Sequence, residues 1–135
     1  METYKHSELT GIIIGCAMKV HRVIGRGFPE IIYLRCLVIE LKKRGLICET
    51  EVPKDIFYEG KNVGSRRLDM MVNGLVIVEL KAIFELENLY FNQVTNYLKV
   101  LKIEVGLLIN FGSKSLQYKR FANYRCEEKK SRKNR

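Results

Sequence analysis

Two carboxylates and one amine interrupt an otherwise apolar stretch of the chain, residues 68–81. Asp69 stands near its start, and Glu79 and Lys81 stand at its end. An ionised carboxylate in a buried sheet is costly unless an opposite charge compensates it. A divalent cation between Asp69 and Glu79 would neutralise both groups and turn a bound water into a nucleophile. With Lys81 to hold or deprotonate that water, or to stabilise charge on a phosphate, this is the chemistry of phosphodiester hydrolysis.

A simpler interpretation of these charges stays open. Glu79 and Lys81 are two residues apart, so on a strand they project from one face. The two charges could then compensate each other directly, with no cation. Asp69 favours the cation only if it lies on that same face, and the turn between the two strands decides this.

The Asn73–Gly74 dipeptide normally indicates a two-residue hairpin loop with a type I′ turn. That loop would place Asp69 opposite Val78, on the face away from Glu79, because side chains alternate along a strand. A shared site would then be impossible.

A loop of three residues, 72–74, gives the other outcome. With Gly74 in the left-handed conformation, it would place Asp69 opposite Ile77 and diagonal to Glu79, with Cα atoms about 7–8 Å apart. Two carboxylates at that spacing can each place an oxygen on one Mg²⁺. We therefore predict the three-residue loop.

The spacing of apolar residues predicts the elements that position these groups. A first helix begins at Ser7, a candidate N-cap, and a second has Pro29 in its first turn and Gly45 at its end. The expected helices span residues 7–24, 28–44 and 89–101, and the expected strands span 46–52, 56–58, 63–72, 75–81, 105–110 and 118–121, with a turn at 59–62. This order indicates an α/β sandwich with a central mixed β-sheet flanked by helices.

Composition narrows the class of partner. A net charge of +9 favours a polyanion, most commonly nucleic acid, although a merely basic, soluble protein is an open alternative. The length predicts one domain over residues 1–125, and the charged stretch 126–135 predicts a basic, disordered tail. The four cysteines form no CxxC pair, so we expect no zinc, and reduced thiols in the cytoplasm. No apolar run is long enough to predict a membrane span.

Two motifs resemble a known family. Asp69, Glu79 and Lys81 form D-x9-E-x-K, which resembles the catalytic signature of the PD-(D/E)XK nuclease superfamily. Residues 27–33, GFPEIIY, match G-x-x-E-x-x-Y, the stretch that names the small bacterial GxxExxY proteins, which are placed in that superfamily. The likeness extends over nearly all of residues 7–121.

The resemblance implies a restriction-endonuclease-like fold and cleavage of nucleic acid, DNA in preference to RNA, with Mg²⁺ or Mn²⁺. It implies that Asp69, Glu79 and Glu30 are metal ligands, with the Leu80 carbonyl as a further ligand and Lys81 at the water. For Glu30 the alternative is a first-turn glutamate that stabilises the helix dipole.

Gln93 and Tyr97 match the Q-x-x-x-Y helix motif of related exonuclease-like branches, which implies a catalytic role for both. They lie one turn apart on one helix face, where both can contact a phosphate or orient a site residue. A partly buried polar pair that caps the sheet is the alternative. The proteins that this chain resembles often have a His-Glu-Ala-Gln run at this place. Here residues 90–93 read YFNQ, so no histidine is present to take any role that it has in those proteins.

Several basic residues are candidates for phosphate contacts, namely Arg67, Lys99 and Lys102, and each is equally suited to solvated surface charge. Two further functions stay open beside a nuclease: a catalytically silent nucleic-acid-binding protein and a partner-binding protein, both on the same fold. A homodimer is also open, because small nucleases often pair to cut two strands.

Overall fold

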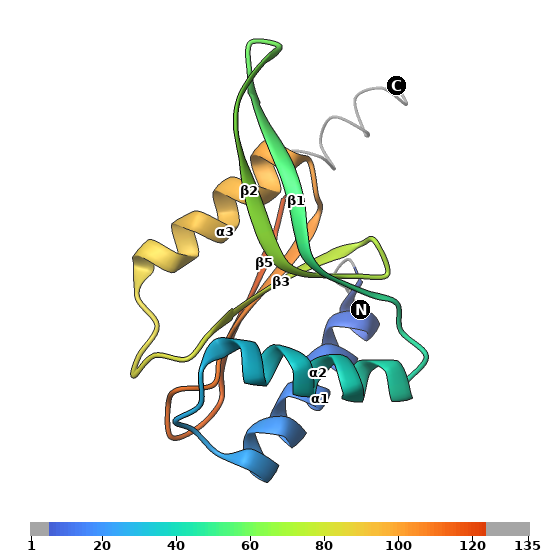
Figure 1. Ribbon diagram of the computed structural model, residues 1–135, viewed down its shortest axis with the longest axis vertical. Helices are drawn as coiled ribbons and strands as arrows, with labels where there is room; N and C mark the ends of the chain where they lie inside the picture. The colour runs from blue at the N-terminus through green and yellow to red at the C-terminus, as the bar shows by residue number, and fades with distance from the viewer. Residues whose placement is uncertain (1–5, 124–135) are drawn as a thin grey trace, which may run out of the picture.

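The computed structural model describes residues 6–123, which form three helices and one five-stranded sheet (Figure 1). In chain order the elements are α1 (Ser7–Ile24), α2 (Glu30–Lys43), β1 (Cys48–Tyr58), β2 (Lys61–Val72), β3 (Val76–Lys81), α3 (Asn88–Leu101), β4 (Val105–Asn110) and β5 (Gln117–Ala122). The predicted tail, residues 126–135, lies outside the described residues. No helix within residues 6–123 is both long and apolar enough to cross a membrane.

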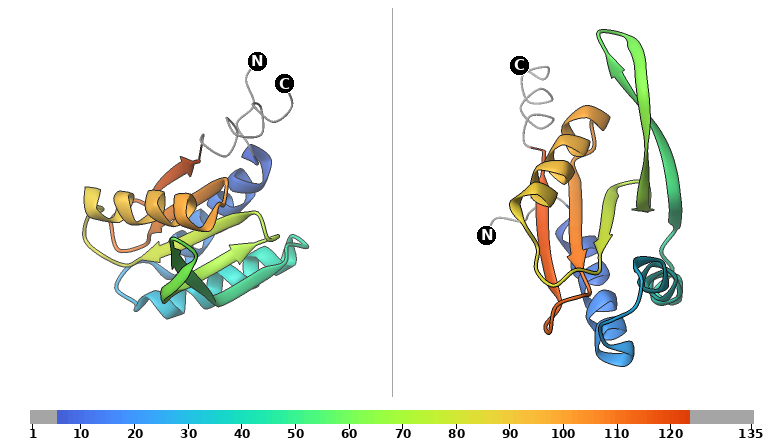
Figure 2. Two further views of the ribbon diagram at one scale, coloured as in Figure 1. Left: turned by 90° about the horizontal axis from the view of Figure 1, so that it is seen from above. Right: turned by 60° about the vertical axis from the view of Figure 1, so that its left-hand side comes forward.

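The strands follow one another across the sheet in the order β1-β2-β3-β4-β5. All neighbours are antiparallel except β3 and β4, which are parallel and are joined by α3. Helices α1 and α2 cover one face and α3 covers the other (Figure 2). The predicted α/β sandwich with a mixed sheet is therefore confirmed.

Side-chain alternation on β3 divides the core into two clusters. Val76, Val78 and Leu80 pack with α1 and α2, whereas Ile77 packs with Leu98 of α3. By the same alternation, the side chains of Glu79 and Lys81 follow Ile77 onto the α3 face. The two charged groups thus come at the end of a strand whose first part is buried on both faces.

The N-terminal caps of α1 and α2 differ from the prediction. Ser7 is not the N-cap of α1: His6 takes that position with a left-handed backbone, and Ser7 is already helical. Helix α2 begins at Glu30 rather than Phe28, because Pro29 keeps an extended conformation and acts as the N-cap.

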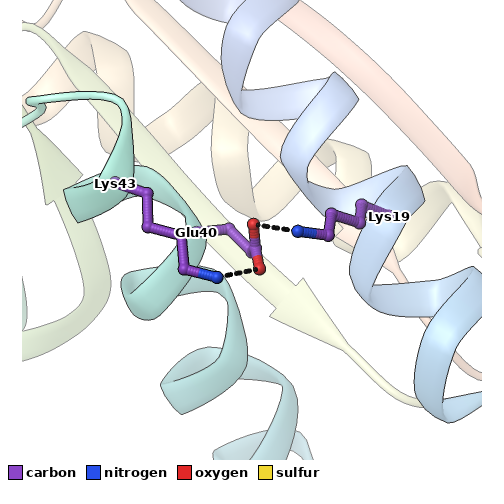
Figure 3. A network of polar contacts seen from close by, with 3 residues as sticks. All are labelled: Lys19, Glu40 and Lys43. Carbon is purple, nitrogen blue, oxygen red and sulfur yellow. Dashed lines mark hydrogen bonds and ion pairs between the residues drawn. The ribbon is translucent and has the colours of Figure 1, made fainter.

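An ion-pair network links α1 to α2. The Lys19 and Lys43 amines lie 2.9 and 3.3 Å from the Glu40 carboxylate (Figure 3).

The two strands predicted over residues 46–52 and 56–58 form one long strand, β1, which begins at Cys48, two residues later than predicted. Pro53 between them does not break it, because β1 is an edge strand where a missing N–H donor is tolerated. The turn after it is also tighter than predicted. Tyr58 pairs with Lys61, and the loop is the two residues Glu59 and Gly60, both at positive φ.

Candidate active site

The loop between β2 and β3 has three residues, as predicted, but it starts one residue later. Val72 pairs with Val76, and Asn73, Gly74 and Leu75 form the loop. Asn73 and Gly74 have φ values of 52° and 65°, and the Leu75 N–H donates to the Val72 carbonyl at 3.0 Å. The tight turn expected of Asn-Gly therefore forms, and Leu75 is an additional residue after it.

This additional residue decides the register of the site. The pairs Met70–Val78 and Val72–Val76 imply that Asp69 comes directly opposite Glu79, not diagonal to it. The predicted diagonal register is thus wrong by two residues, but a shift of two keeps the same face. The two carboxylates are closer than the prediction had them.

The ladder between β2 and β3 stops at Met70, and side chains replace it at Asp69. The Asp69 N–H donates to Glu79 Oε1 at 3.2 Å, and the Leu80 N–H donates to Asp69 Oδ2 at 2.8 Å. The sheet therefore opens between the two strands at this point. Because the N–H and C=O of a strand residue face the same edge, the Leu80 carbonyl also points toward β2.

Glu79 carries the largest electrostatic perturbation of this site. Withdrawal from solvent and repulsion by Asp69 raise its pKa to about 8, against an ordinary value of 4.5, and the Lys81 amine offsets only part of this. Without a cation, the pair therefore favours a proton on Glu79. A divalent ion bound to both carboxylates would cancel the repulsion that raises the pKa of Glu79.

Lys81 faces α3, and its amine lies 4.8 Å from the centroid of the Tyr90 ring. It forms no ion pair with another residue among residues 6–123. The interpretation in which Glu79 and Lys81 neutralise each other predicts a short contact between them, and the described residues do not contain it. Tyr90 instead offers its ring face to the amine.

The G-x-x-E-x-x-Y stretch has a clear structural role at the start of α2. The buried Tyr33 hydroxyl donates to the Gly25 carbonyl at 2.8 Å and accepts the Phe28 N–H at 3.2 Å. Its ring stacks on Phe111 with centroids 4.6 Å apart. Tyr33 thus holds the loop that leads into Glu30.

Glu30 lies within electrostatic reach of the strand residues. Burial raises its pKa, with a lowering contribution from Lys81 and a raising one from Asp69. Glu30 and Asp69 also line one pocket of about 160 Å³ between α2 and the β1–β2 pair. The structure therefore brings together Glu30, Asp69, Glu79 and Lys81.

Glu51 is a pocket residue that the sequence did not indicate. The pairs Thr50–Met70 and Val52–Leu68 place it on β1 opposite Asp69 of β2, and its φ of 52° is rare for a strand residue. Its carboxylate lies 3.9 Å from the Arg67 guanidinium, and both side chains line the pocket. Arg67 therefore lies at the same pocket as Asp69.

The α3 residues lie farther along. Tyr97 packs on the second core cluster and Gln93 is exposed, and within residues 6–123 neither is hydrogen-bonded to the carboxylates of the site. Lys102 follows the C-terminus of α3 and lines a pocket with Gly74, beside the start of β3. Lys99 and Lys102 thus lie at the opposite end of α3 from Tyr90 and Lys81.

A buried amide, also missed in the sequence, supports the strand end. Asn110 pairs with Lys81 across β3 and β4, exchanges two hydrogen bonds of 3.0 Å with the Ile83 backbone, and donates to Gln117. A Cβ at Gly112 would overlap the Ile83 backbone, so this position requires glycine. Asn110 and Gly112 together fix the loop that follows Lys81.

A metal ion would have a small ligand set here. No group of three or more His, Cys, Asp or Glu side chains within residues 6–123 is arranged to hold a metal. Asp69 and Glu79 would supply two hard oxygen ligands, and Mg²⁺ commonly keeps several waters beside one or two carboxylates. The two facing carboxylates therefore fit such an ion.

Comparisons with known proteins bear on the family and the fold of the chain. A family model described as the PD-(D/E)XK nuclease superfamily matches residues 7–121. No curated protein matches the chain. Among solved structures, "Crystal structure of SSO0001" is 18% identical with a TM-score of 0.53, over 94% of this chain and 67% of that chain. At this identity the likeness shows the fold alone.

Proposed function

The chain belongs to the PD-(D/E)XK nuclease superfamily, and from this premise we propose that it is a Mg²⁺-dependent nuclease that hydrolyses phosphodiester bonds, in DNA rather than RNA. The observation that carries the proposal is the pair Asp69 and Glu79, which face each other where the sheet opens. Their repulsion has no compensating ion pair among the described residues, and a divalent cation would relieve it.

Asp69 and Glu79 are the proposed metal ligands. The Leu80 carbonyl and Glu30 are further oxygen ligands, supported by the orientation of the Leu80 peptide and by the coupling of Glu30 to Asp69. Bound Mg²⁺, or Mn²⁺ in its place, would offset the charge of the phosphate and acidify a water.

Lys81 has the role of holding the attacking water or a phosphate oxygen. Its ammonium group has three donors and no described ion-pair partner that would occupy them. Its electrostatic coupling to Glu79 and Glu30 supports a position beside the carboxylates. Tyr90 keeps the amine at the end of β3 before substrate arrives.

Gln93 and Tyr97 have supporting roles in this proposal, as residues that contact a phosphate or orient the site. Gln93 is exposed one turn after Tyr90 on the same helix face, which leaves it free to meet a substrate. Lys99 and Lys102 then contact the nucleic acid away from the cleaved bond, and Arg67 contacts it at the pocket.

The proposal includes membership of the GxxExxY family within the superfamily. It is supported by the way Tyr33 of that motif holds the loop before Glu30. It also includes a cytoplasmic location, supported by the free cysteines Cys16, Cys36 and Cys48.

A cleavage panel tests the proposal. Purified protein is incubated with single- and double-stranded DNA and RNA, with Mg²⁺, Mn²⁺ or a chelator. We expect metal-dependent cleavage that Lys81→Ala lowers by at least about 100-fold, the usual scale for a residue engaged in proton transfer. The matched control is Lys42→Ala, which removes an exposed lysine at the other end of α2 from Glu30.

The outcomes separate the candidate functions. Cleavage that survives Lys81→Ala at the wild-type rate would contradict the proposed site. Salt-sensitive binding with no cleavage under any metal would favour the silent nucleic-acid-binding protein.

A further inference from the structure

The outer halves of β1 and β2 form an arm, residues 53–67, that projects from the sheet beyond the helices (Figures 1 and 2). Every residue of the arm is exposed except Lys54 and Ile56, which are partly buried. Strands of 11 and 12 residues are about twice the usual length, and a two-stranded hairpin is marginally stable by itself. The arm therefore contributes little to the stability of the fold and leaves its surface open to a partner.

The arm carries an unfavourable arrangement of charge. Lys54 lies directly opposite Arg66, and like charges at such a position destabilise a strand pair. Neither side chain has an ion-pair partner among residues 6–123. A polyanion bound across this face would turn the repulsion into attraction, so the pair points to phosphates.

The tip of the arm distinguishes nucleic acid from other polyanions. Phe57 and Tyr58 are 59% and 67% exposed, and no core lies behind them. Aromatic faces beside basic side chains are how proteins stack on the bases of a strand while they hold its backbone.

The arm is also continuous with the pocket of the site. Arg67, its last residue, lines that pocket together with Asp69, two residues further along β2. A strand of nucleic acid at the pocket would therefore lie next to the base of the arm. Over residues 53–67, the basic residues Lys54, Lys61, Arg66 and Arg67 outnumber the acidic residues Asp55 and Glu59.

We infer that the arm is a nucleic-acid-binding element that grips the substrate beside the cleaved bond, with Lys54 and Arg66 on phosphates and the tip rings on bases. The inference rests on the proposed function, which explains why a strand of nucleic acid would lie at the pocket. Its test is a binding measurement, which does not depend on turnover.

The test compares Lys54→Gln/Arg66→Gln with wild type by fluorescence anisotropy, with labelled single-stranded and duplex DNA and RNA in the presence of a chelator. We expect about tenfold weaker binding and a log–log salt slope smaller by about 1.4 for single strands or 1.8 for duplex, the values for two phosphate contacts. The matched control is Arg35→Gln/Lys42→Gln, with the same change in charge on exposed positions of α2.

Thermal unfolding separates a binding defect from a folding defect. Because the variant removes a like-charge pair, its melting temperature should stay at or above that of wild type. Binding equal to that of the control variant would overturn the inference. Substitutions in the arm that dissociate a homodimer and leave nucleic-acid binding intact would overturn it as well. Wild type that binds through the arm without cleavage would overturn the nuclease proposal alone.

Discussion

At the scale of single residues, the site is a set of charges that oppose one another. Glu79 and Asp69 meet head-on across two strands, and each accepts a backbone N–H of the other strand. These hydrogen bonds hold the carboxylates in place but do not cancel their repulsion, which raises the pKa of Glu79 to about 8. The folded protein therefore holds two mutually repelling carboxyl groups together at the expense of its own stability.

This repulsion predicts a pH dependence of stability. A carboxyl whose pKa is raised in the folded state stabilises the fold below its ordinary pKa of 4.5, and loses that contribution as pH rises toward about 8. The free energy of unfolding of metal-free protein should therefore fall by an amount on the order of a few kcal/mol over this range. Glu30, also raised, acts in the same direction.

Urea unfolding at several pH values measures it, with Glu79→Gln as the comparison. The variant should lose most of the slope and be more stable than wild type near pH 8. Added Mn²⁺ should stabilise wild type most at high pH, where Glu79 gives up its proton. Equal slopes in both proteins would contradict the assignment to Glu79.

At the scale of elements, the start of α2 determines where Glu30 lies. Tyr33 fastens the preceding loop through two hydrogen bonds and stacks on Phe111. The Phe111 N–H in turn donates to the Lys81 carbonyl at 2.8 Å. One chain of contacts thus connects the helical carboxylate with the strand that carries the amine.

Tyr33→Phe removes the hydroxyl and keeps the ring. We expect a loss of about 1–3 kcal/mol in the free energy of unfolding, because two backbone groups lose their partner. Cleavage should fall as well, and Glu30→Gln should then lower the rate less in this background than in wild type. Tyr118→Phe, at an exposed tyrosine of β5, is the control and should change stability by less than about 0.5 kcal/mol.

Much of this element structure could be predicted. The bounds of α1 and β4 match the prediction, since the apolar spacing of each had no competing pattern. The register of the β2–β3 hairpin did not match the prediction, because one additional residue after a tight turn leaves no local signal in the sequence. The parity that keeps Asp69 and Glu79 on one face was still correct.

Other parts of the site had no signal in the sequence. Glu51 is separated from Asp69 by 18 positions, and only strand pairing brings the two together. Asn110 looked like the polar end of an apolar strand, but its amide is fully engaged in hydrogen bonds that fix the next loop. Contacts between distant segments decide both cases, and local spacing does not contain them.

At the scale of the whole molecule, the sheet has a well-packed half and a projecting half. Residues 70–72, β3 and β4 are covered by helices on both faces, whereas the arm has no helix over most of its length. Stability should differ between the two halves, because burial of apolar surface is confined to the first.

Amide hydrogen exchange measures this difference. Amides of residues 53–67 should exchange at least about 100-fold faster than those of β3 and β4, because the arm can open without loss of the core. Added oligonucleotide that cannot be cleaved should slow exchange in the arm and leave that of β5 unchanged. Uniform protection across both halves would contradict this division.

The left-handed backbone of Glu51 has a consequence for efforts to stabilise the protein. A left-handed backbone at a residue with a side chain costs of the order of 1 kcal/mol, and glycine avoids that cost. A laboratory search for heat-resistant variants would therefore drift toward glycine at this position, and would discard the acidic neighbour of Arg67 in doing so. Higher thermal stability and the acidic lining of the pocket thus require different residues at position 51.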